Sequence, residues 1–217
     1  MMRTCTFRRL EAGLLFLLAL LLNSGGAALR TQEGLAEKVV RLHVLANSDA
    51  PADQSMKLQV RDRILRETAP LLSAAGSRAE AEAALRARLP ELSQAARDAL
   101  DACGCSYPVA LELREAEFPT RDYGAFALPA GRYVTLRAVI GAGAGRNWWC
   151  VVFPPLCGAV GAGDASGDGA EGAIAAADFT ADEIALITRK NAAYALKFRV
   201  AECWESLRQR LTKSQCP

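Results

Sequence analysis

Residues 117–157 read EFPTRDYGAFALPAGRYVTLRAVIGAGAGRNWWCVVFPPLC. The stretch is unusually rich in stiff and aromatic residues for a connecting region, and it predicts two strands. Residues 132–140 are rich in β-branched and aromatic side chains, and residues 148–153 form a short apolar run that Pro154-Pro155 ends. Because the glycines of GAGAG (141–145) lie between the two runs, we expect a hairpin that joins two core strands.

The chain before this stretch predicts a strand, two helices and a further strand. In residues 38–46, KVVRLHVLA, apolar side chains alternate in the manner of a half-buried strand. A helix is expected over about 52–68, followed by a connector and a second helix from 77 to about 102, which Pro90 should kink or split. Alternation then returns in 109–118, as expected of a strand.

The chain after this stretch changes character again. Residues 158–179 are rich in Gly, Ala and Asp and are interpreted as a flexible linker. Thr180 and Glu183 fit a capping box, which predicts a C-terminal helix over about 181–211 within a helical segment 180–217. The order of elements predicts an α+β domain over 29–157, with helices packed on one face of a mainly antiparallel sheet, and a C-terminal helix after the Gly-rich linker.

Residues 1–28 have the layout of a secretory signal peptide. Arginines at 3, 8 and 9 precede the apolar run GLLFLLALLL (13–22), and small residues follow at 24–28. The run is too short for a typical membrane-spanning helix, which needs roughly 20 residues. We therefore expect export, with residues 1–28 either cleaved near Ala28 or kept as an N-terminal anchor.

Charge and cysteine content agree with an exported domain. The three arginines and one glutamate of residues 1–28 leave 23 basic and 23 acidic residues in the rest, so nothing in the balance favours nucleic acid or anionic lipid. Six of the seven cysteines also lie beyond residue 28, which allows 15 full pairings. Cys150 and Cys157 flank Pro154-Pro155 and are a disulfide candidate; Cys103 and Cys105 are expected as a disulfide or free thiols rather than a zinc site.

No catalytic or cofactor motif emerges from the residues. His43 is the single histidine, and it lies within a predicted strand, although Ser48 and Asp49 follow closely. The GAGAG segment leads into a strand rather than a helix and lacks a lysine, so a nucleotide loop is not expected. No cofactor and no metal are therefore predicted.

A long ordered set of segments then resembles one known family. The segments are RLHVLANSD (41–49), Lys57, VRD (60–62), FPT (118–120), YG (123–124), PAGRY (129–133), NWWC (147–150) and FPPLC (153–157). Together they resemble the stage II sporulation protein R family, the intercompartmental signals of endospore-forming bacteria, over about residues 38–157. The Gly-rich linker and the tail from Gly158 lie outside the resemblance.

The resemblance implies a role without chemistry of its own. Members of the family are exported from the forespore into the space between the two membranes. There they trigger a membrane-embedded aspartic-type protease of the mother cell, which cleaves the sigma-E precursor. The chain is then expected to be a protein ligand of that protease and not an enzyme.

Seven polar or aromatic residues within these segments are candidates for the partner surface, and for each the alternative is fold maintenance through a turn, a helix cap or a core strand: Asn47, Ser48, Asp49, Tyr123, Asn147, Trp148 and Trp149. A second hypothesis is an extracytoplasmic hydrolase of envelope material that uses His43 with Asp49, or Glu115 with Glu117. A third is a purely structural envelope protein.

Overall fold

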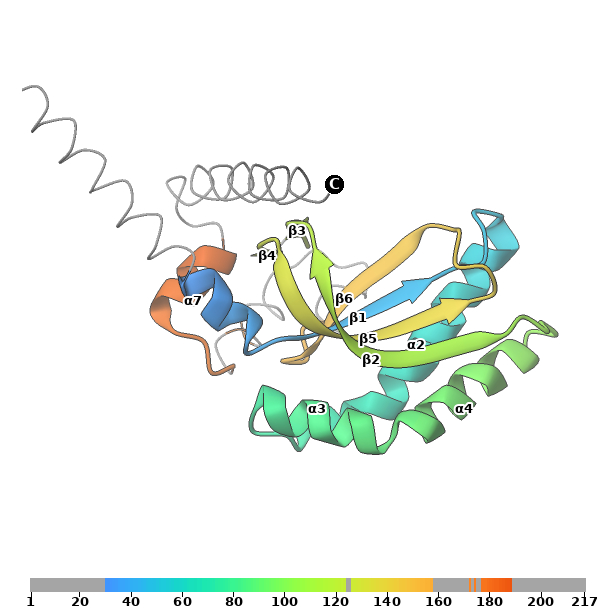
Figure 1. Cartoon of the computed structure of the whole chain (residues 1–217), viewed down its shortest axis with the longest axis horizontal. Helices are drawn as coiled ribbons and strands as arrows, with labels where there is room; N and C mark the ends of the chain where they lie inside the picture. The colour runs from blue at the N-terminus through green and yellow to red at the C-terminus, as the bar shows by residue number, and fades with distance from the viewer. Residues whose placement is uncertain (1–29, 124–125, 158–171, 173, 175–176, 189–217) are drawn as a thin grey trace, which may run out of the picture.

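A four-stranded mixed sheet forms the centre of the computed structural model, which describes residues 30–123, 126–157, 172, 174 and 177–188 (Figure 1). Its strands are β1 (Val40–Leu45), β2 (Val109–Phe118), β5 (Gly131–Ile140) and β6 (Asn147–Phe153), in the spatial order β2-β5-β1-β6. Two of the three strand pairs, β2 with β5 and β1 with β6, are antiparallel, whereas β1 and β5 are parallel. The α+β prediction with a mainly antiparallel sheet is confirmed.

The hairpin expected around GAGAG is wrong. β5 and β6 run antiparallel to each other, but β1 lies between them and hydrogen-bonds to both. The glycine segment therefore crosses the end of β1 instead of turning back onto its own strand. The alternation in each strand was sufficient to predict the strands, but it carries no information about which strand lies next to which.

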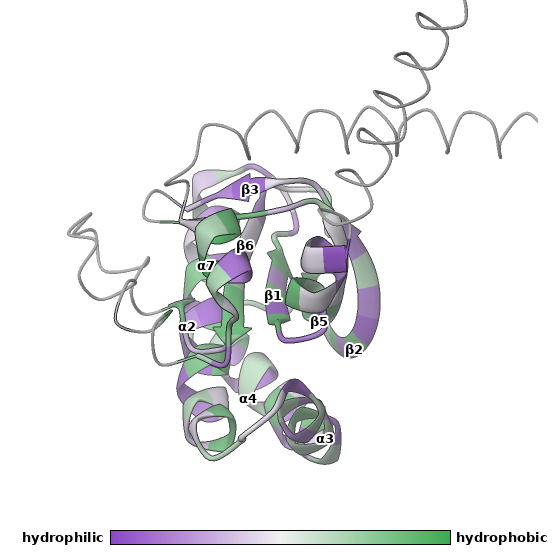
Figure 2. Ribbon diagram, turned by 90° about the vertical axis from the view of Figure 1, so that its left-hand side faces the viewer, coloured by the Kyte–Doolittle hydropathy of each residue, from purple (hydrophilic) through white to green (hydrophobic). Residues whose placement is uncertain are grey.

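Three helices cover one face of the sheet: α2 (Pro51–Ser73), α3 (Arg78–Ala87) and α4 (Leu89–Asp101) (Figures 1 and 2). The connector expected from residue 70 is wrong, because α2 continues through Pro70 and buries Leu72 in the core. The split expected at Pro90 is confirmed, since α3 ends at Ala87 and Pro90 lies in the first turn of α4, where its missing N–H costs no hydrogen bond.

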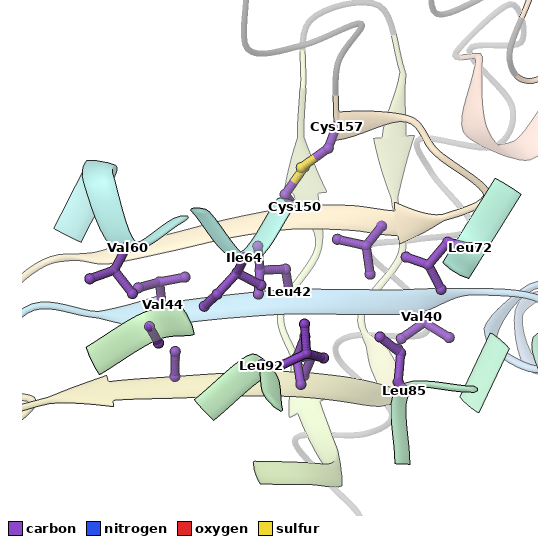
Figure 3. Close-up of a cluster of buried hydrophobic side chains, with 14 of the residues drawn as sticks. Val40, Leu42, Val44, Val60, Ile64, Leu72, Leu85, Leu92, Cys150 and Cys157 are labelled. Carbon is purple, nitrogen blue, oxygen red and sulfur yellow. A yellow bond between two sulfur atoms is a disulfide. The ribbon is translucent and has the colours of Figure 1, made fainter. Parts of the chain in front are cut away.

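The main core lies between this helical layer and the sheet (Figure 3). Val40, Leu42 and Val44 alternate along β1 and all point toward the helices, where Val60 and Ile64 of α2 meet them. All five side chains are fully buried. The period of two in the strand and the spacing of four in the helix thus produce one continuous apolar layer.

A disulfide joins Cys150 to Cys157 at the edge of this core, as the sequence suggested (Figure 3). Cys150 lies on β6, and Cys157 follows the two prolines that end this strand. Among the described residues, Cys103 and Cys105 are free thiols. The disulfide therefore fixes the segment after β6 against the strand itself.

A second, smaller layer covers part of the opposite face of the sheet. It consists of a helical stretch at residues 30–36, the two-stranded ribbon of β3 (Arg121–Asp122) and β4 (Ala127–Leu128), and α7 (Ala181–Ile187). These elements enclose a second apolar cluster whose members include Leu35, Phe126 and Leu186. The initial helical stretch and the ribbon were not predicted, because two-residue strands have no readable alternation.

Only part of the predicted C-terminal region lies within the described residues. The capping box of Thr180 and Glu183 is present and starts α7 at the predicted residue. Ile174, within the segment interpreted as a linker, is buried in the second cluster. The predicted signal segment 1–28, most of the linker and residues 189–217 lie outside the described residues. Within the described part of the chain, no helix is long and apolar enough to cross a membrane.

Candidate interaction surface

The loop after β1 and the glycine segment form a tight junction at one end of the sheet, here called the loop junction (residues 46–49 and 141–146). Asn47 lies at its centre, because its side-chain oxygen accepts a hydrogen bond from the Ala142 N–H at 2.9 Å. The backbone N–H groups of Ala144 and Gly145 donate to the carbonyls of Asn47 and Ala46 at 3.1 and 2.9 Å. The two loops therefore replace the missing hairpin with bonds between segments about a hundred residues apart.

The glycines of this segment are required by close approach. A Cβ at Gly141, whose φ is +56°, would lie 2.3 Å from the Asn47 Oδ1 atom, and a Cβ at Gly145 would lie 2.2 Å from the Ser48 carbonyl oxygen. Both distances are shorter than any van der Waals contact. The alternating glycines are thus explained by a backbone crossing and not by a bound nucleotide.

The carboxylate of Asp53, in the first turn of α2, connects the loop junction to this helix. It accepts hydrogen bonds from the Ser48 hydroxyl at 2.6 Å and the Asn47 amide at 2.8 Å, and these bonds hold the pKa of Asp53 below its usual value. The ammonium of Lys57 donates to the Arg146 carbonyl at 3.0 Å. Its pKa is lowered, chiefly by burial. Ser48 and Asn47 therefore have structural partners, as their fold-maintenance interpretation requires.

On the opposite side of the sheet from α2–α4 lies a second group of side chains, here called the aromatic face: Arg41, His43, Phe118, Tyr123, Tyr133 and Trp149. Arg41 is the centre of the group. Its guanidinium lies 3.9 Å from the centroid of the Phe118 ring and 5.1 Å from that of Tyr133. Its Nη2 donates to the Tyr123 hydroxyl at 2.6 Å. Burial lowers the pKa of Arg41 and raises that of Tyr123.

The aromatic face continues along β1 to the end of the sheet. Trp149 contacts Phe118 and His43 edge to face, with ring centroids 5.7 and 5.5 Å apart. His43 Nε2 lies 3.1 Å from Asn147 Oδ1. Burial is the main reason that the pKa of His43 is lowered, so the ring is held neutral near physiological pH. Arg121 of the ribbon covers the Trp149 ring at 4.2 Å.

The two neighbouring tryptophans face opposite sides of β6, as the strand period predicts. Trp148 lies on the helical side, where the guanidinium of Arg61 from α2 stands 4.2 Å above its ring. Trp149 lies on the aromatic face. Both are half-buried, and the indole N–H of each is shielded from solvent without a hydrogen-bond partner among the described residues.

The structure therefore separates the seven sequence candidates into three groups. Tyr123, Asn147 and Trp149 belong to one continuous set of contacts that runs through Arg41, Phe118 and His43. Asn47, Ser48 and Asp49 belong to the loop junction, where the Asp49 carboxylate accepts from the Arg146 N–H at 2.6 Å. Trp148 is on the other side of the sheet.

Sequence reasoning missed Arg41, Phe118 and Tyr133 as parts of this surface. The alternation of β1 places Arg41 beside His43 on the face that was expected to be the polar one, and nothing in that pattern indicates that the face is covered. The signal that could have found Arg41 is Val39, an apolar residue two positions earlier on the same face, which is fully buried in the second cluster.

The residues of the hydrolase hypothesis are not assembled as that chemistry needs. His43 pairs with Asn147, whereas Ser48 donates to Asp53 and Asp49 accepts from Arg146. Glu115 and Glu117 are exposed on β2, and Arg132 lies 3.8 and 3.6 Å from their carboxylates. The described residues contain no group of three or more potential metal ligands. Each residue named for the hydrolase hypothesis thus has another partner among the described residues.

Comparisons with known proteins identify the family. Residues 36–161 match the family model described as stage II sporulation protein R. The stage II sporulation protein R of Bacillus subtilis (strain 168) is 36% identical over 123 residues, which cover 57% of this chain and 55% of that protein. The chain thus spans about half the length of this relative, and no solved structure matches it. The match covers both the loop junction and the aromatic face, and the chain belongs to the stage II sporulation protein R family.

Proposed function

We propose that the chain is an exported sporulation signal that activates a membrane-embedded aspartic-type protease in the mother cell, which then processes the sigma-E precursor. The observation that carries this proposal is the family match over residues 36–161, which supports a role in sporulation. The protein acts by binding, without a cofactor or a metal. The unassembled hydrolase residues are consistent with such a ligand.

In this proposal, export brings the protein to the compartment where its partner protease lies. Residues 1–28 direct the chain from the forespore into the intermembrane space and are then either cleaved or kept as a membrane tether. The neutral charge of the remaining chain suits recognition by a specific protein surface more than general attraction to anionic lipid. Mass spectrometry of the exported protein measures both the N-terminus and the thiol state.

The aromatic face is the contact surface in this proposal. Aromatic and arginine side chains dominate the binding energy of protein interfaces, because they combine large apolar area with directed polar atoms. Tyr123 and Trp149 are half-buried at this face, and Asn147 is exposed at its end. The loop junction holds β6 in register with β1 and so keeps Asn147 and Trp149 in place.

The test is co-expression of the full chain with the protease and the sigma-E precursor of the same organism, followed by immunoblotting of precursor cleavage. We expect cleavage to depend on the chain. The Trp149→Ala and Asn147→Ala variants should remain folded and lose most of the activity, whereas Tyr107→Ala, which removes an exposed aromatic outside this surface, should retain it. Cleavage that is unchanged when the folded chain is withdrawn would refute the proposal.

The His43→Ala variant separates this proposal from the hydrolase hypothesis. A hydrolase that depends on the single histidine would lose its function completely. A ligand should keep part of its activity, because His43 only supports its neighbours in the aromatic face, Trp149 through a ring contact of 5.5 Å and Asn147 through one polar contact of 3.1 Å, and would not take part in any reaction.

A further inference from the structure

The guanidinium of Arg41 is a buried charge that has no buried counter-charge within the part of the chain that the structure describes. Its side chain has no exposed surface, and its Nε and Nη1 atoms have no hydrogen-bond partner among the described residues. One described bond remains, from Nη2 to the Tyr123 hydroxyl. The ionisable groups that influence its pKa, Tyr123, Tyr133 and Arg121, provide no negative charge near neutral pH.

Such an arrangement is unusual for a group that serves only the fold. Buried charges in proteins are normally paired, and buried donors are normally hydrogen-bonded. The rings of Phe118 and Tyr133 compensate part of the charge through cation–π contact but leave the in-plane N–H groups unsatisfied. An apolar side chain of similar length would fit an apolar cluster with less desolvation.

Another arginine on the same sheet face provides the contrast. Arg137 lies beside His43 in the parallel pairing of β5 with β1. Its Nη1 donates to the Glu112 carboxylate at 2.8 Å. The described residues thus provide a carboxylate for Arg137 and none for Arg41.

The unsatisfied groups define the ligand that would complete the site. Each edge of the Arg41 guanidinium pairs Nη2 with either Nε or Nη1, and Tyr123 takes only one of the two Nη2 protons. The second Nη2 proton and one unsatisfied neighbour can therefore donate two parallel hydrogen bonds, which match the two oxygens of a carboxylate. The Tyr123 hydroxyl accepts from Arg41 and still has its own proton to donate. The indole N–H of Trp149, which contacts the same Phe118 ring, is a further unpartnered donor. All these groups donate, so the missing ligand is an acceptor with negative charge.

We propose that Arg41, with Tyr123 and Trp149, forms a carboxylate-binding site that receives an Asp or Glu side chain of the partner protease. The proposal rests on the function proposed above and adds the chemistry of its contact. Since Arg41 is fully covered and Tyr123 and Trp149 are half-buried, binding of the carboxylate requires the side chains that cover Arg41 to move. Arg121, above Trp149, adds positive charge at the entrance.

The first test compares Arg41→Met with Arg137→Met in the cleavage assay and in thermal unfolding. Arg41→Met should keep or raise the unfolding midpoint and reduce precursor cleavage at limiting protein by at least about tenfold, because the partner's carboxylate loses its buried counter-charge. Arg41→Lys keeps the charge but not the two parallel donors and should also lose activity. Arg137→Met should keep it. A folded Arg41→Met variant with full activity, or one that is destabilised relative to the wild type, would overturn the proposal.

The second test needs no protease, and it separates failure of this site from failure of the proposed function. The unfolding midpoint of the full chain is measured against sodium acetate, with sodium chloride at equal ionic strength as the reference. We expect the unfolding midpoint of the wild type to rise by about 3–5 °C once the acetate concentration exceeds the dissociation constant tenfold. Arg137→Met should show the same rise, and Arg41→Met should show none. No rise in the wild type, or an equal rise with inorganic phosphate, would contradict a carboxylate site. Loss of cleavage in the wild type with the acetate rise intact would contradict the proposed function alone.

Discussion

Replacing Asn47 and Gly141, singly and together, tests the close approach at the loop junction. Asn47→Ala removes two hydrogen bonds, the one from the Ala142 N–H at 2.9 Å and the one to Asp53 at 2.8 Å. A hydrogen bond contributes about 1 kcal/mol net to stability. We therefore expect this substitution to lower the free energy of unfolding by about 2 kcal/mol.

Gly141→Ala has two separate costs. The φ of +56° disfavours any residue with a Cβ by about 1 kcal/mol. The new methyl group would also lie 2.3 Å from the Asn47 side-chain oxygen, and relief of such overpacking costs about 2 kcal/mol. The single variant should thus lose about 3 kcal/mol.

The double variant should be less destabilised than the two single effects together. Without the Asn47 amide, the nearest remaining atom of residue 47 is its Cβ, at 3.0 Å from the added methyl group, so most of the overlap disappears while the cost of the positive φ stays. The expected loss is about 3 kcal/mol instead of the roughly 5 kcal/mol of additivity, a coupling of about 2 kcal/mol.

Urea unfolding followed by circular dichroism measures all four proteins of this cycle. Gly104→Ala is the matched control: its φ is +67°, and an added Cβ meets no atom within 4 Å. It should cost about 1 kcal/mol and combine additively with Asn47→Ala. Additivity of the Gly141 pair within about 0.5 kcal/mol would refute the crossing of the two loops as described.

Three further predictions concern the disulfide, the histidine and the last described helix. Replacing both Cys150 and Cys157 with alanine should lower the free energy of unfolding, measured by thermal unfolding, by about 2–3 kcal/mol. A reductant should lower the stability of the wild type to the same level. A wild type whose stability does not change with reductant would contradict the disulfide. Because the pKa of His43 is lowered on folding, its contribution to stability is present above pH 6.5 and is lost as the pH falls toward the folded pKa. His43→Gln should therefore make the free energy of unfolding less dependent on pH below pH 6.5. A variant with the same slope as the wild type would contradict the burial of His43. Thr180→Ala removes the hydrogen bond from the Glu183 N–H to the Thr180 hydroxyl, which stabilises the start of α7 by about 1 kcal/mol. Amide hydrogen exchange in α7 should therefore become about fivefold faster, and an unchanged exchange rate would contradict the role of this cap.

Local patterns were enough to predict most of the elements. The alternation around Leu42 predicted the central strand, Pro90 predicted the break between α3 and α4, and Thr180 with Glu183 predicted the start of α7. Each of these features depends on neighbours within a few residues. The helix through Pro70 was missed because burial of Leu72 on the sheet outweighs the lost backbone hydrogen bond.

The arrangement of the site depended on distant contacts and could not be predicted in the same way. The turn signal of the glycines suggested a hairpin, but the parallel pairing of Val40 with Val134 places β1 between the two strands. Arg41 was expected on the polar face because an arginine in an alternating strand usually lies in solvent. Its burial depends on Phe118 and Tyr123, which lie on elements whose pairing the sequence does not specify.

If the chain is exported as proposed above, the position of β1 between β5 and β6 has a consequence for the order of events. The strand that would then leave the membrane first is a central strand of the sheet, and both of its neighbours come from the far end of the domain. The His43–Asn147 bond, for example, joins residues 104 positions apart. A chain that crosses a membrane unfolded, N-terminus first, therefore has no complete sheet until about Phe153 has emerged.

Pairing at such separations is also slow, because the loop entropy is lost before the contacts form. The aromatic face needs β1, β2 and β6 together, so no partial product of translocation presents it. Under the proposed function, an arrested or truncated chain would then not activate its partner. For a signal that is exported as proposed, this topology would make activity depend on complete transfer of the domain.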